Sequence, residues 1–236
     1  MSLIEQSAVR NRLLKRLSPD DFALLQPHLR PMATEMRQGL IEPYLPVRDL
    51  FFPETGYASI TTAGLGKIEV GIIGPEGVVG ATPVLLGSDR TPYDHFVQNA
   101  GEMLAIGAPE ILAATEISPA LRRLLLRFVQ TLLIQTAQTA FANASYNIEV
   151  RLTRWLLMCH DRVIGDDIAV THDFLSYMLG VQRTTVTLAL QLLEGNRLIR
   201  ARRGRIVVLD RAGLLAVAGD SYGVPEAEYA RLIEEA

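Results

Sequence analysis

Residues 171–190 read THDFLSYMLGVQRTTVTLAL, and the spacing of apolar and small residues in this stretch decides the fold of the C-terminal part of the chain. Thr171 is suited to cap a first helix, and Gly180 can adopt the left-handed backbone conformation that ends it. Leu175 and Leu179 lie four residues apart on one face of that helix, while Val186 would anchor a second helix against it. This arrangement predicts a helix-turn-helix.

The start of the predicted second helix carries polar side chains on its outer face, namely Gln182, Arg183, Thr184 and Thr187. Arginine can bond a guanine edge with two N–H groups, glutamine can pair with adenine, and threonine can contact a thymine methyl or a phosphate. The amino end of a helix also attracts phosphate. We therefore expect this helix to lie in the major groove of double-stranded DNA, with Thr171 among the contacting residues.

A short β-hairpin is predicted directly after the second helix, because two apolar runs at 197–200 and 206–209 surround a glycine turn. The predicted phosphate or minor-groove contacts at its tip are Arg202, Arg203 and Arg205. Residues 181–211 contain seven arginines and two acidic residues, although the formal net charge of the chain is −3. A basic hairpin after a helix-turn-helix is typical of a winged DNA-binding domain.

The rest of the chain divides into two further zones. Between about residues 32 and 109, glycine or proline recurs every few residues and separates short apolar runs such as YASITT at 57–62. This punctuation predicts an antiparallel β-roll, preceded by short helices. The expected fold class is α+β, with a β-roll (jelly-roll) sensor domain in residues 1–117, a long central helix in 118–146 and a winged helix-turn-helix domain in 147–236.

One face of the predicted central helix is apolar. Its stripe consists of Leu125, Phe128, Leu132, Ala137, Ala140, Phe141 and Ala144. The periodicity fits equally well a helix that packs on the β-roll of its own chain and a helix that pairs with its copy in a homodimer.

The segment from Phe174 to Leu209 resembles the C-terminal domain of the Crp/Fnr family of bacterial transcription regulators, above all in MLGVQRTTVTLALQLLE at 178–194. The order of β-roll, long helix and winged helix is similar to that family over nearly the whole chain. The resemblance implies a homodimer paired through the central helix, a palindromic operator read by two recognition helices, and RNA polymerase as a further partner.

The resemblance also implies a cyclic-nucleotide-binding-like sensor, but the sequence departs from the family pattern. Residues 77–80 read GVVG, so the glutamate that the family uses to bind the ribose is a valine. The positions that remain as effector-binding candidates are Gly77, Gly80, Arg90, Thr91 and Gln138. Losing a charge-assisted hydrogen bond costs a few kcal/mol of affinity. We therefore expect that any small-molecule effector is not cyclic AMP, and its identity stays open.

Other classes of function find little support in the sequence. The lone cysteine, Cys159, cannot supply an iron–sulfur cluster, and the four histidines are far apart, so we expect no metal, no cofactor and no enzyme. No signal peptide or membrane-spanning stretch is recognisable, which predicts a cytoplasmic protein without a membrane partner. The alternative is a ligand-sensing or interaction module that does not bind DNA, and the arginine-rich wing argues against it.

Overall fold

Two antiparallel sheets form the β-roll of the N-terminal half in the computed structural model, which describes residues 3–64 and 68–235. The predicted outer limits of the domains, residues 1 and 236, lie outside the described residues. The first sheet has the order β1-β7-β3 and the second β2-β6-β4-β5. The strands are β1 (Arg30–Ala33), β2 (Gly39–Ile41), β3 (Asp49–Pro53), β4 (Tyr57–Thr62), β5 (Glu69–Ile73), β6 (Tyr93–Asn99) and β7 (Glu102–Gly107).

Helices close the roll because its inner face is apolar. They are α1 (Arg12–Arg16), α2 (Pro19–Leu25), α3 (Ala81–Leu85), α4 (Ala108–Ile117) and the long α5 (Pro119–Ser145). Ser118 begins α5, since its hydroxyl accepts the N–H of Leu121 at 3.1 Å and a proline follows in the first turn. Helix α5 contributes side chains to the same core as the strands of the roll, among them Leu125, Phe128 and Leu132.

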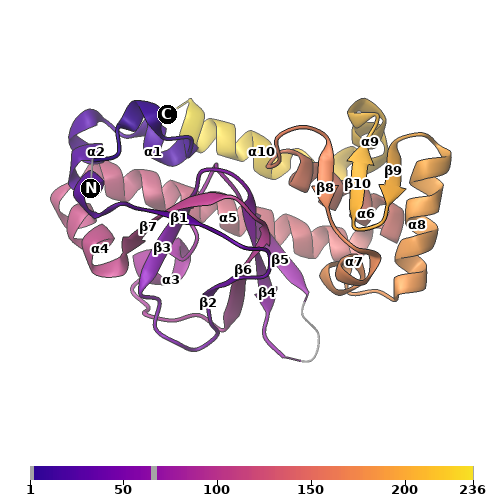
Figure 1. The fold of residues 1–236 in the computed structure, drawn as a ribbon, viewed down its shortest axis with the longest axis horizontal. Helices are drawn as coiled ribbons and strands as arrows, with labels where there is room; N and C mark the ends of the chain where they lie inside the picture. Colours follow the sequence, from indigo (N-terminus) through magenta and orange to yellow (C-terminus); the bar gives the residue numbers. More distant parts are fainter. Residues whose placement is uncertain (1–2, 65–67, 236) are drawn as a thin grey trace.

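The C-terminal half is a second layer of helices around a small sheet. It contains α6 (Ile148–His160), β8 (Asp167–Ala169), α7 (His172–Leu179), α8 (Arg183–Gly195), β9 (Ile199–Arg202), β10 (Arg205–Val208) and α9 (Arg211–Ala218). The sheet has the order β8-β10-β9, so the predicted hairpin is present and β8 extends it by a third strand. The predicted α+β fold class, with a β-roll, a long central helix and a winged helix-turn-helix, is confirmed (Figure 1).

After α9 the chain returns to the roll through α10 (Val224–Tyr229) and a π-helical turn (Ala230–Glu234). This tail lies along α5 and ends beside the N-terminal helices (Figure 1). Tyr229 and Ile233 are buried in the core of the roll, and the carboxylate of Glu234 pairs with Arg12. Residues at both ends of the described chain thus contribute to one domain.

The two halves also share a direct contact. Tyr57 and Ile72 of the roll are buried among the apolar residues of the C-terminal half. The rings of Phe96 on β6 and Phe174 on α7 meet edge to face with their centres 6.2 Å apart. The winged domain is therefore docked on the outer face of the β2-β6-β4-β5 sheet as well as joined to it through α5.

Gly77 provides a test of how closely α5 approaches the roll. A methyl group added at Gly77 would lie 2.4 Å from the Phe128 ring, whereas nothing lies within 4 Å of the same position at Gly39. We expect Gly77→Ala to lower the free energy of unfolding by about 1–3 kcal/mol, because the buried ring must move. Gly39→Ala is the matched control and should change stability by less than about 0.5 kcal/mol. Urea unfolding measures both, and equal stability of the two variants would contradict the close contact.

Candidate nucleic-acid interface and sensor cavity

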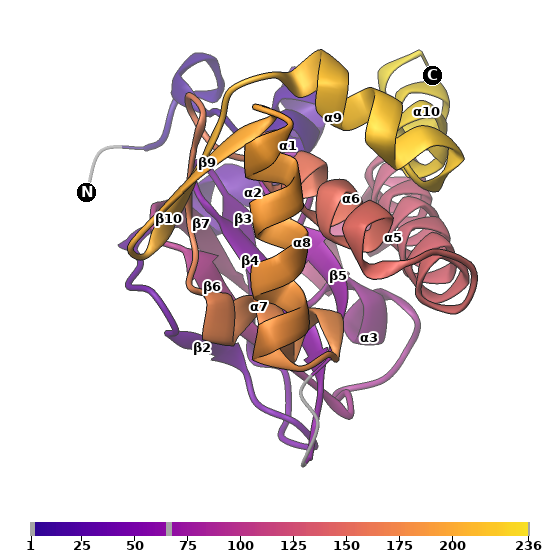
Figure 2. The same cartoon turned by 90° about the vertical axis from the view of Figure 1, so that its right-hand side faces the viewer.

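The helix-turn-helix is built by local signals that the sequence analysis recognised. The Thr171 hydroxyl accepts the N–H of Phe174 at 3.2 Å at the start of α7, and Gly180 ends that helix with φ of 63°. Leu175 and Val186 are fully buried where α7 and α8 cross. The buried side chains fix the angle between the helices and leave the amino end of α8 at the surface (Figure 2).

The predicted base-reading residues gather at this end of α8. Gln182, Arg183 and Thr184 are exposed. Thr187 is half-buried, and its hydroxyl donates to the carbonyl of Arg183 at 3.0 Å and lies 3.2 Å from Nδ1 of His172. The Thr187 hydroxyl therefore bonds to groups within the protein. The methyl group of Thr187 is the part of the side chain that remains to contact a base.

Arg183 has a partner that the sequence analysis did not assign. Its Nε lies 3.2 Å from Oδ1 of Asp173 in the first turn of α7, and both side chains are about two-thirds exposed. An exposed pair of this kind contributes little to stability but occupies one edge of the guanidinium. Asp173 is the acidic residue in the first turn of α7, two positions after the capping Thr171.

The wing presents its arginines at the tip of the β9–β10 hairpin. Arg202, Arg203 and Arg205 are exposed, as predicted. Arg205 lies 3.7 Å from Asp167 on β8, the strand that the sequence did not reveal. The amino end of α8 and the wing thus both carry exposed arginines, and Asp173 and Asp167 lie beside two of them.

The five effector-binding candidates have different surroundings. Gly77 lies against Phe128, and Gly80 lies against Ile41 and Asp49. Thr91 is buried next to the backbone of Tyr44. The remaining two lie outside the roll interior: Arg90 is exposed and bonds Asp89 at 2.8 Å, and Gln138 reaches the carbonyl of Asp220 on the tail. The hydrogen bond from Arg90 lowers the pKa of Asp89.

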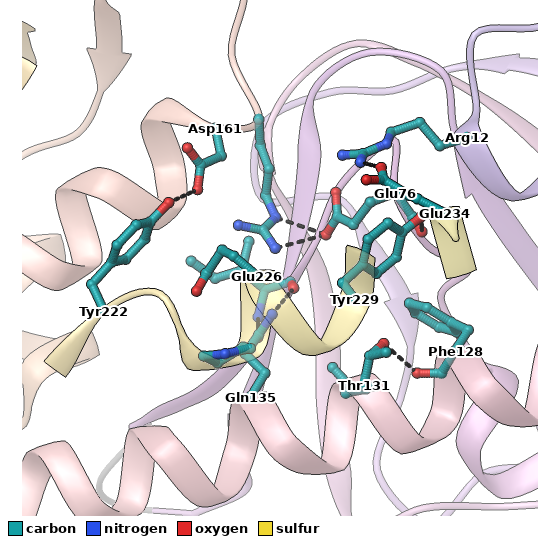
Figure 3. A pocket seen from close by; sticks show the side chains of 14 residues that line it. Arg12, Glu76, Phe128, Thr131, Gln135, Asp161, Tyr222, Glu226, Tyr229 and Glu234 are labelled. Atoms are coloured by element: carbon teal, nitrogen blue, oxygen red, sulfur yellow. Dashed lines mark hydrogen bonds and ion pairs between the residues drawn. The ribbon is translucent and has the colours of Figure 1, made fainter. Parts of the chain in front are cut away.

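A cavity of about 360 Å³ lies instead between α5, the end of α6 and the tail, a position that the sequence analysis missed (Figure 3). Glu76 bonds Arg162 at 2.8 Å on one side, and the Tyr229 hydroxyl donates to the Glu76 carbonyl at 2.8 Å. Glu226 faces the same space, and burial raises its pKa. Because the tail supplies part of the wall, only the folded chain reveals this cavity.

The predicted dimer stripe divides into two sets. Leu125, Phe128 and Leu132 face the core of their own chain and are buried there, so the expectation that they pair with a second copy needs correction. The set that remains exposed on α5 consists of Ala137, Ala140, Phe141 and Ala144. The reason is the 3.6-residue period, which turns a long apolar stripe from the roll to solvent along α5.

Comparison with known proteins agrees with this geometry. Residues 150–217 match the family model of the Crp-like helix-turn-helix domain. No curated protein matches the chain in sequence. No helix of the described residues is long and apolar enough to cross a membrane.

Three solved structures illustrate the similarity of the fold. FixK2 from Bradyrhizobium japonicum is 14% identical, with a TM-score of 0.69 over 81% of this chain and 98% of that chain. The c-di-GMP-responsive global regulator CLP from Xanthomonas campestris is 19% identical, with a TM-score of 0.64 over 81% and 99%. A Crp/Fnr-family transcriptional regulator from Thermus thermophilus is 18% identical, with a TM-score of 0.61 over 80% and 98%.

The chain is thus a β-roll protein with a winged helix-turn-helix DNA-binding domain. Its DNA-binding domain is of the Crp-like type, and its fold is that of the Crp/Fnr transcription regulators.

Asp173 allows a test of the role of its arginine partner. We expect Asp173→Asn to raise the affinity for a random DNA duplex about two- to fivefold, because Arg183 is released and a negative charge near the phosphates is removed. Fluorescence anisotropy at fixed salt measures the change. Asp20→Asn, an exposed acid in the first turn of α2, is the control and should leave the affinity unchanged. Equal affinities of the two variants would contradict a DNA-facing position of Asp173.

Proposed function

We propose that this protein is a transcription regulator of the Crp/Fnr family that binds a palindromic operator as a homodimer in the bacterial cytoplasm. The observation that carries the proposal is the exposed amino end of α8, with Arg183, beside a wing that presents three arginines. One such surface reads one half-site, and a second copy about one DNA turn away would read the other.

The exposed face of α5 supports the homodimer. Leu133 and Phe141 have 51% and 52% of their surface exposed, and alanines at 137, 140 and 144 lie on the same face. Large apolar side chains in a row on a helix that is otherwise packed on its own domain are typical of a protein–protein contact. Paired α5 helices would place the two winged domains on the same side of the dimer.

Gating by a small-molecule effector is the second part of the proposal. A change in the sensor half would be transmitted through α5 to the spacing of the two α8 helices. The regulator CLP from Xanthomonas campestris, whose fold is similar, responds to c-di-GMP. The proposal does not name the effector of this chain. Contact with RNA polymerase is part of the proposal because regulators of this kind act on transcription.

The dimer proposal predicts the effect of one substitution. We expect Phe141→Glu to weaken self-association at least tenfold, since a charge would be buried in the contact. Sedimentation equilibrium measures the dissociation constant. Ile164→Glu, at a residue with 85% of its surface exposed in the winged domain, is the control and should leave association unchanged. A monomeric wild type, or a dimer unaffected by Phe141→Glu, would exclude pairing through this face.

The DNA-binding proposal is tested by selection from a randomised duplex pool at several salt concentrations. We expect enrichment of a two-fold palindrome and a steep loss of binding with salt. The double variant Arg183→Ala with Arg203→Ala should lose at least tenfold in affinity and most of the sequence preference, because it removes one predicted base contact and one predicted phosphate contact. Unchanged binding by the double variant would favour the alternative of a ligand-sensing or interaction module.

A further inference from the structure

Glu69 is a buried acid at the contact between the β-roll and the winged domain. It lies on β5, and only 6% of its surface is exposed. Trp155 on α6 donates from Nε1 to Oε1 of Glu69 at 2.7 Å, so this hydrogen bond joins the two halves directly. The other carboxyl oxygen lies 2.6 Å from the hydroxyl of Ser59 on β4.

With the amide oxygen of Gln98 turned toward Ser59, the hydrogen bonds around Ser59 are complete when Glu69 carries a proton. The Ser59 oxygen contacts both Oε2 of Glu69 and Oε1 of Gln98 on β6. A hydroxyl has one proton, so it can donate to only one of these two acceptors. A protonated Glu69 donates to Ser59, and Ser59 then donates to Gln98.

Two arginines near Glu69 form their hydrogen bonds with other groups. Arg154 donates from Nε to the carbonyl of Ser221 at 3.0 Å, and Arg162 bonds Glu76 and the carbonyl of Met158. Among the described residues, no cation lies within ion-pair distance of Glu69.

Two other titratable groups that face Glu69 are neutral. Burial raises the pKa of Tyr57 on β4 and of Cys159 on α6, so both stay neutral. A small space beside Glu69 is lined by uncharged residues of α5 and α7 and by two arginines of α6, Arg151 and Arg154. Arg151 is bonded to Asn143 and the carbonyl of Leu179.

We infer that Glu69 is a proton-dependent latch, which holds the winged domain against the β-roll when its carboxyl group is protonated and loosens that contact when it is ionised. Ionisation would leave a buried carboxylate with no cation in ion-pair contact, because Arg154 and Arg162 bond other groups, and such a charge is costly. The inference concerns the contact between domains and holds whether or not the proposed operator is found.

The direction of the pH effect follows from the burial of Glu69, which raises its pKa from 4.5 to about 7. Separation of the domains would expose the carboxyl group and return its pKa to the ordinary value. The docked form therefore binds more protons, so docking is strongest below the ordinary pKa and weakens as the pH rises through 7. With these two values, docking is about tenfold weaker at pH 8 than at pH 6.

Trp155 is the single tryptophan of the chain and reports on this contact. We expect its fluorescence to show a transition near pH 7 that is absent in Glu69→Gln, since glutamine cannot ionise. Two controls should keep the transition: Glu226→Gln, which removes another buried acid, and His160→Asn, which removes the imidazole on the same helix. A transition that survives in Glu69→Gln, or is lost in His160→Asn, would overturn the assignment.

Hydrogen exchange tests the docking itself. After correction for the intrinsic effect of pH, amides of β5 should lose about tenfold in protection from pH 6 to pH 8, while amides of the β1-β7-β3 sheet should not. Glu69→Gln should remove this difference. If circular dichroism shows that Glu69→Gln is unfolded, Trp155→Phe replaces it and should lower β5 protection already at pH 6. Protection of β5 that is independent of pH in the wild type would exclude the latch.

Discussion

The contact of Phe128 with the roll constrains the rest of the molecule. Its ring lies so close to Gly77 that a side chain at that position would collide with it, and the same face of α5 supplies Leu125 and Leu132 to the core. A helix of 27 residues cannot bury all its faces in one domain. The face left over at Ala137, Ala140 and Phe141 is therefore available to a partner, and the direction of α5 sets where the winged domain begins.

Features encoded by neighbouring residues were predictable from the sequence. The cap at Thr171, the turn at Gly180 and the glycine turn of the wing are local signals, and each has the predicted conformation. The central helix extends from Pro119 to Ser145, close to the predicted 118–146, because serine and proline mark its start. For the same reason the candidate residues at the start of α8 lie together in the structure.

Features that depend on distant residues were not predictable. Periodicity could not tell which part of the stripe on α5 faces the roll, because a core helix and a paired helix have the same apolar spacing. Strand β8 and its Asp167 were missed because three residues give no pattern of their own. The hydrogen bond between Glu69 and Trp155 joins residues 86 positions apart, and the cavity beside Tyr229 exists only because the tail returns. The neighbours of the effector candidates are likewise supplied by other segments, so the resemblance alone could not show what surrounds them.

The return of the tail has a consequence for biosynthesis. Tyr229 and Ile233 belong to the core of the β-roll, although about 120 residues of helices and the winged domain separate them from the last strand of the roll. During translation the β-roll will have emerged from the ribosome long before these two side chains are made. The nascent roll must wait with part of its apolar surface uncovered while the winged domain is synthesised, and it reaches its final core only when the tail arrives.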